Sequence, residues 1–180
     1  MTGWFAVLVV ILAAANPAVL AGTRPADTTP PGGTTSTGGS LRLRGVALGL
    51  GVVALIALGA DAILEALSVS APTFRTAAGA VVGIGGAVEV VRRRPTAKDA
   101  ADDVTGGLLS TLLPPLVFAA VTMATDDDWW LTAVALVVTL AATAGLTSAP
   151  PRVRAWARIT FGGLAVGTGV LLVSAGIRAV

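Results

Sequence analysis

Residues 71–91 read APTFRTAAGAVVGIGGAVEVV, and they contain only two charged side chains, Arg75 and Glu89, one toward each end. About 20 mostly apolar residues are enough for an α-helix to cross the roughly 30 Å hydrocarbon layer of a bilayer. The run is continuous, whereas strands of a membrane barrel alternate apolar and polar residues. The stretch therefore predicts a membrane-spanning helix at about residues 73–91.

Other apolar runs of similar length lie on both sides of this stretch. They predict further spans at about residues 4–21, 45–67, 106–124, 129–146 and 155–177. The whole chain is 54% hydrophobic and only 12% charged, whereas about a quarter of the residues in a soluble domain are charged. We therefore expect an all-α, polytopic bundle of about six spans that forms a single membrane domain over residues 1–180, with the lipid bilayer as its solvent.

The predicted spans fall into two halves. The first half covers about residues 1–92, a charged connector covers 93–104, and the second half covers about 105–180. Residues 23–41 are rich in Thr, Gly and Pro and predict a flexible loop. Val19-Leu20-Ala21 resembles a signal-peptide cleavage site, but no Lys or Arg precedes Arg24, so cleavage of the first span stays open.

Composition excludes several classes of chemistry. The chain has no Cys and no His, which removes disulfides, zinc sites of the Cys/His type and every His-based triad. We expect no enzyme activity, no cofactor and no metal site. The formal net charge is only +2, and the basic residues lie beside apolar spans, so no nucleic-acid partner is expected and the basic residues read as topology signals. Oligomeric state, including a homo-oligomer, stays open.

The basic residues predict an orientation. With six spans, the first, third and fifth connections lie on one side and hold most of the basic residues, while only Arg75 and Arg178 fall on the other side. The positive-inside rule makes the odd connections cytoplasmic, so both termini and the acidic turn at residues 126–128 are expected outside. Composition rich in Ala, Val, Gly and Arg favours a prokaryotic inner membrane.

Two helices look like copies of each other. One constant offset matches Arg75 with Arg158, Gly79 with Gly162 and Gly86 with Gly169. The first and fourth spans also correspond, because each contains proline, so each half reads as one broken helix followed by two intact ones. An odd number of spans in each half places the copies in opposite orientations, which is the inverted repeat of many secondary transporters.

The proline positions are the candidate solute-binding residues: Asn16, Pro17, Pro114 and Pro115. A break in a membrane helix frees backbone amides and carbonyls, and such backbone is tolerated at membrane depth only where protein or water covers it. The alternative is that these prolines merely kink their helices. Their occurrence in both halves favours a functional role.

Charged residues near the outer ends are candidates for ion or proton coupling. Asp61 and Glu65 lie four residues apart, on one face of the second span, where a carboxylate can bind a cation or carry a proton. Arg75 would neutralise one of them. The alternative is a solvated helix end. Glu89 lies one turn before residues 92–94, three arginines, which favours a surface ion pair there.

Three pairs of glycines have the spacing that lets membrane helices approach closely. They are Gly45 with Gly49, Gly79 with Gly83, and Gly163 with Gly167. We expect all three pairs to mark helix packing surfaces.

Residues 71–91, and especially PTFRTAAGA at 72–80, resemble the third-helix signature of the MarC family of six-helix membrane proteins. Asn16-Pro17 resembles the family's motif in helix one, and residues 158–177 are similar to its last helix. The fourth span departs from the pattern, because Pro114-Pro115 runs into LVFAA without the expected Gly-Pro-Gly. The resemblance implies a transporter of small neutral amino acids with a fold related to LysE-type exporters.

Together these features predict a secondary transporter or exporter of a small polar solute, coupled to H⁺ or Na⁺ or uncoupled, that works by alternating access at a midplane site between two broken helices. The rival interpretation is a non-transporting scaffold or assembly partner, whose glycine faces pack against another protein. An intramembrane enzyme would need a convergent set of polar residues, and the sequence places only Asp61 and Glu65 close together.

Overall fold

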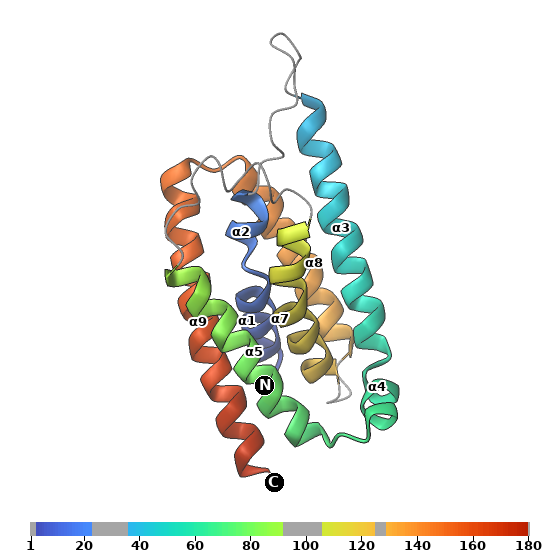
Figure 1. The fold of residues 1–180 in the computed structure, drawn as a ribbon. Helices are drawn as coiled ribbons and strands as arrows, with labels where there is room; N and C mark the ends of the chain where they lie inside the picture. The colour runs from blue at the N-terminus through green and yellow to red at the C-terminus, as the bar shows by residue number, and fades with distance from the viewer. Residues whose placement is uncertain (1–2, 23–35, 92–105, 125–128, 180) are drawn as a thin grey trace.

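The computed structural model describes residues 3–22, 36–91, 106–124 and 129–179, and these residues form helices without strands. The helices run up and down side by side in an elongated bundle (Figure 1). They are α1 (Gly3–Ala15), α2 (Pro17–Gly22), α3 (Ser36–Leu58), α4 (Ala60–Leu67), α5 (Ala71–Val91), α7 (Gly106–Ala124), α8 (Trp129–Thr147) and α9 (Pro151–Arg178). The expected all-α fold is confirmed for this part of the chain.

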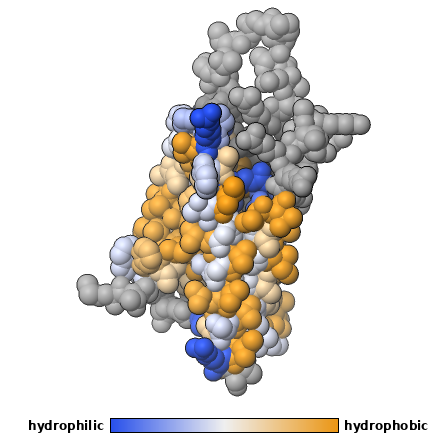
Figure 2. Space-filling view, turned by 90° about the vertical axis from the view of Figure 1, so that its left-hand side faces the viewer, coloured by the Kyte–Doolittle hydropathy of each residue, from blue (hydrophilic) through white to orange (hydrophobic). Residues whose placement is uncertain are grey.

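Three helices, α5, α8 and α9, are long and apolar enough to cross a bilayer. The pair α3 and α4 passes the same test as one span, although the two helices are bent by 62°. Residues 4–15 of α1 and 114–124 of α7 are shorter apolar helical stretches. On the face that carries α9, hydrophobic residues cover most of the middle, and hydrophilic residues gather toward the two ends (Figure 2). The apolar helices thus indicate a membrane-embedded protein, with three full-length candidate spans among the described residues, or four if the bent pair is one span.

The centre of the bundle is filled by apolar residues, many of them alanines. Ile11 of α1, Val53 of α3, Val82 of α5 and Ala119 of α7 have no exposed surface. Larger apolar side chains such as Leu55, Ile84 and Leu171 point outward. This pattern is the reverse of a soluble bundle and suits a protein whose outer surface contacts lipid, because lipid tails are as apolar as leucine.

The closest helix contact in the described bundle is the antiparallel crossing of α5 and α9, the green and the orange-to-red helices of Figure 1. A Cβ added at Gly79 would lie 2.7 Å from the Gly169 carbonyl oxygen, and one at Gly86 would lie 2.6 Å from the Gly162 oxygen. A Cβ at Gly176 would collide with the Thr76 hydroxyl. The backbones therefore touch along the crossing, which only glycine permits.

The expected glycine pairs are confirmed on only one helix. Gly79 and Gly83 both face Gly169, but a Cβ at the other four positions, Gly45, Gly49, Gly163 and Gly167, would meet no atom within 4 Å. The row of α9 that contacts α5 consists instead of Gly162, Gly169 and Gly176. Glycines seven residues apart lie on one helix face, so this spacing, and not the four-residue spacing, identifies the α9 surface.

The second predicted span differs from the prediction in its start and in its straightness. Helix α3 begins at Ser36, so residues 36–41 are helical, while residues 23–35 of the predicted loop lie outside the described part. Extending a helix costs far less than nucleating one, which lets poor helix formers continue the apolar run. The second predicted span bends at Gly59 into α4. The connector at 93–104 and the acidic turn at 126–128 also lie outside the described residues.

Candidate functional site

The chain breaks between α1 and α2 at Asn16. Its φ of 39° is in the left-handed region, which Asn tolerates better than most residues. The backbone amide of Asn16 still donates to the Leu12 carbonyl, at 3.1 Å. Pro17 has no N–H, so the Ala13 carbonyl loses the donor that a continuous helix would supply. The predicted break in the first span is therefore present in the structure.

The Asn16 side chain is 2% exposed and lies inside the bundle. Its Nδ2 donates a long hydrogen bond, 3.4 Å, to the backbone carbonyl of Arg158 in α9. Its Oδ1 is buried and has no hydrogen-bond partner. Most buried polar side-chain atoms are hydrogen-bonded, so an exception of this kind indicates strain, a functional role or an unseen water or ion.

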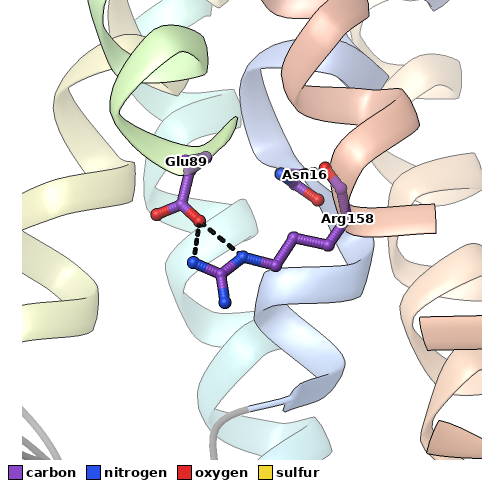
Figure 3. Close-up of polar contacts among 3 residues, drawn as sticks. All are labelled: Asn16, Glu89 and Arg158. Carbon is purple, nitrogen blue, oxygen red and sulfur yellow. Dashed lines mark hydrogen bonds and ion pairs between the residues drawn. The ribbon is translucent and has the colours of Figure 1, made fainter. Parts of the chain in front are cut away.

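Glu89 and Arg158 form an ion pair beside Asn16 (Figure 3). The Nη2 and Nε atoms of Arg158 lie 2.9 Å and 3.0 Å from the same carboxylate oxygen, Oε2 of Glu89. The Glu89 side chain is 7% exposed and that of Arg158 is 25% exposed. The predicted surface position of Glu89 is wrong, because Glu89 is buried and pairs with Arg158 of α9. Its predicted partners at 92–94 lie outside the described residues.

A small cavity connects the break and the ion pair. Its volume is about 10 Å³, close to the space that one water molecule needs. Asn16 at the break, Glu89 of α5 and Pro115 of α7 line it, and the remaining wall is small and apolar: Ala13, Ala14, Val82, Gly85, Gly86, Gly162 and Ala165. Asn16 and Glu89 are thus the polar residues of a site that is otherwise apolar.

The two predicted proline sites differ in their effect on the backbone. Pro115 is buried and lines the same cavity as Asn16, while Pro114 is exposed. The predicted interruption of the fourth span is absent, since α7 is one helix from Gly106 to Ala124 with both prolines inside it. Proline removes a backbone donor without necessarily ending a helix when surrounding helices supply packing. Only the first proline motif interrupts its span.

The predicted coupling residues do not reach this site. Asp61 and Glu65 are both exposed on α4, and Asp61 lies in the first turn of that helix, where a carboxylate is favourable beside the helix dipole. Arg75 lies near the start of α5, at the opposite end of the helix from Glu89. Asp61, Glu65 and Arg75 are not among the residues that line the cavity at Asn16.

A second cavity of about 40 Å³ lies between α3 and α8. Trp129 and Leu58 line it, and Thr132 contributes a buried hydroxyl without a hydrogen-bond partner. The other lining residues are alanines. This cavity has one hydroxyl group and no charged residue in its lining, so it provides fewer groups that could bind a polar ligand than the site at Asn16 does.

Sequence reasoning missed Glu89 and Arg158 as site residues. The available signal was that Glu89 is one of only two charges in residues 71–91, and an ionisable residue within a membrane helix is expensive unless it is paired. Within the described ranges, no three His, Cys, Asp or Glu residues gather as they would around a metal ion. The site can accept donors or a small cation through oxygen atoms of Asn16 and Glu89.

Comparison with known proteins supplied no relative for this chain. No family model, no curated protein and no solved structure matches it.

Proposed function

We propose that this protein is a secondary transporter of a small polar solute, with its site at the break between α1 and α2. The observation that supports this most is Asn16, whose buried Oδ1 has no partner and whose backbone interrupts an apolar helix at a small cavity that Glu89 also lines. Binding sites in secondary transporters lie near the bilayer midplane at discontinuous helices. From Gly3 to Asn16 the chain rises about 20 Å, which is inside the hydrocarbon layer if Gly3 lies at its boundary. The resemblance of residues 71–91 to the MarC third helix points in the same direction.

An inverted repeat with about six spans is part of this proposal. The repeat matches Gly79 with Gly162 and Gly86 with Gly169. Gly79 of α5 contacts Gly169 of α9, and the matching residues, Gly162 of α9 and Gly86 of α5, also contact each other. Two antiparallel helices related by a two-fold axis have this property, because each contact between them is repeated with the two helices interchanged. Asn16 and Pro115, from the first predicted span of each half, line one cavity. These contacts support a site at the interface between the two halves.

The cavity is far smaller than a solute, so the proposal requires a closed state that opens during the transport cycle. Alternating access supplies such opening through rocking of one half against the other. The scaffold interpretation, in contrast, requires no opening, and the small cavity favours it as the second candidate. Flux distinguishes the two.

Replacement of Asn16 by Gly is expected to lower solute flux in proteoliposomes by at least tenfold. Gly keeps the left-handed backbone at this position but removes the buried amide. The assay would compare small polar solutes, including small neutral amino acids, for the original protein and the variant. Pro17→Ala is the companion variant, because it restores a backbone N–H that can reach the Ala13 carbonyl. If the Asn16→Gly variant transports as fast as the original protein, Asn16 does not bind the solute. If the folded original protein transports none of the solutes, the scaffold interpretation is favoured.

Orientation can be tested directly because the chain has no Cys. Single substitutions Asp127→Cys and Thr96→Cys would be labelled in intact cells with a thiol reagent that does not cross membranes. We expect labelling at Asp127→Cys from outside, and labelling at Thr96→Cys only after permeabilisation, because the basic connections are expected in the cytoplasm. The reverse pattern would contradict the proposed topology.

A further inference from the structure

Glu89 is the one buried carboxylate in the described part of the chain. The other described carboxylates, Asp61 and Glu65, are exposed. Glu89 lines the small cavity beside Asn16, and its Oε2 accepts from both the Nε and the Nη2 of the Arg158 guanidinium. A buried ion pair brings a large desolvation cost that often exceeds the gain from pairing. A pair of leucines would pack here at no such cost, so the charges indicate a role beyond stability.

The ion pair also breaks the symmetry of the α5–α9 crossing. At the repeat offset that matches Gly79 with Gly162, the position that matches Glu89 is Leu172, and the one that matches Arg158 is Arg75. Leu172 cannot form an ion pair with Arg75, so the contact of Glu89 with Arg158 has no counterpart at the other end of the crossing. A feature present at one end only is suited to make the two ends of a transporter respond differently.

The cavity next to Glu89 has the size and lining for a single small cation. At about 10 Å³ it accommodates one atom-sized ligand and not a solute. The unpartnered Asn16 Oδ1 and the Glu89 carboxylate are hydrogen-bond acceptors. Ala13 also lines the cavity, and Pro17 supplies no N–H to its carbonyl. Oxygen acceptors of this kind bind Na⁺ or a protonated species and repel anions.

We propose that Glu89 is the cation-coupling residue, at which a proton or a sodium ion competes with Arg158 for the carboxylate. In the proton case, Oε2 gains an O–H bond, the guanidinium of Arg158 keeps its own protons, and the ion pair opens. In the sodium case, the ion enters the cavity beside Asn16 and replaces the guanidinium as the charge partner. Coupling is thereby assigned to Glu89 and not to Asp61 or Glu65.

Among the described residues, few other charges lie near Glu89, and the three arginines at 92–94 that follow it in the sequence lie outside the described part of the chain. Among the described residues of the helices that pack against α5, Arg158 faces Glu89 and Arg154 lies one turn before it on α9, while α1 and α7 contain no ionisable side chains. Arg75 lies at the far end of α5. A change with pH or sodium that depends on Glu89 can therefore be assigned to this pair.

The test is cation binding by the purified protein in detergent, measured without solute. The melting temperature is recorded in sodium chloride and in N-methylglucamine chloride at equal ionic strength, and the infrared band of a protonated carboxyl group is followed through a pH titration. A sodium-specific rise of about 3 °C that Glu89→Gln abolishes identifies sodium. A titrating carboxyl band that Glu89→Gln abolishes identifies the proton.

Two further variants keep the result interpretable. Glu65→Gln, on the exposed face of α4, is expected to retain the response of the original protein. The double variant Glu89→Gln, Arg158→Gln removes both charges together, so it is expected to fold and to lack the response. Absence of any sodium or pH response in the original protein, or a response that persists in a folded Glu89→Gln variant, would overturn the proposal. The inference rests on the proposed transport function, but the binding readout needs no flux, so the two can fail separately.

Discussion

Gly169→Ala is expected to destabilise the protein by about 3 kcal/mol, the upper end of the usual cost of overpacking. The added Cβ would lie 2.6 Å from the Gly79 carbonyl oxygen and 2.6 Å from the Gly83 Cα. Both atoms belong to the backbone of α5 and cannot rotate away, so the two helices would have to separate along the crossing. The free energy of unfolding in detergent, measured with increasing denaturing detergent, is the readout.

Gly167→Ala is the matched control for this experiment. It lies in the same helix, two residues away, and an added Cβ would meet no atom within 4 Å. Alanine is a better helix former than glycine by about 1 kcal/mol in water, so this variant is expected to be neutral or slightly more stable. Equal losses for the two variants would mean that the crossing does not depend on backbone contact at Gly169.

The sequence predicted the helices well because the length of an apolar run is a strong and local signal. The ends of α7 were predicted at the residues where the structure has them, and the break at Asn16 followed from the adjacent proline. The bend after α3 was missed because Gly59 has no proline beside it, and glycine is common inside membrane helices.

The ion pair between Glu89 and Arg158 could not be predicted from local sequence. The two residues are 69 positions apart, and pairing them requires knowing that α5 and α9 pack antiparallel with Gly86 against Gly162. The internal repeat pairs Arg158 with Arg75 as equivalent positions, and this equivalence gives no indication that Arg158 contacts Glu89 in the other half. Local spacing instead offered the nearer arginines at 92–94, which is the short-range pairing that helix geometry usually favours.

The second large effect is expected for Arg158→Met, which removes the partner of a buried carboxylate. Leaving one member of a buried pair alone typically costs about 3–5 kcal/mol, and we expect about 3 kcal/mol, because the Arg158 side chain is 25% exposed and water can reach part of the site. Unfolding in denaturing detergent again provides the free energy. Arg152→Met, at an exposed position of the same helix, controls for the loss of one positive charge and is expected to have little effect.

The double variant Glu89→Gln, Arg158→Met separates pairing from packing. If the cost of the single variant comes from an unpaired buried charge, removal of that charge should restore most of the lost stability, because a neutral pair avoids the desolvation penalty of both ions. A double variant as unstable as Arg158→Met would instead mean that the arginine stem stabilises the bundle through its apolar contacts. Recovery of stability together with loss of the sodium or pH response would show that the charges serve the coupling function and are not needed to hold α5 against α9, which the glycine contacts already do.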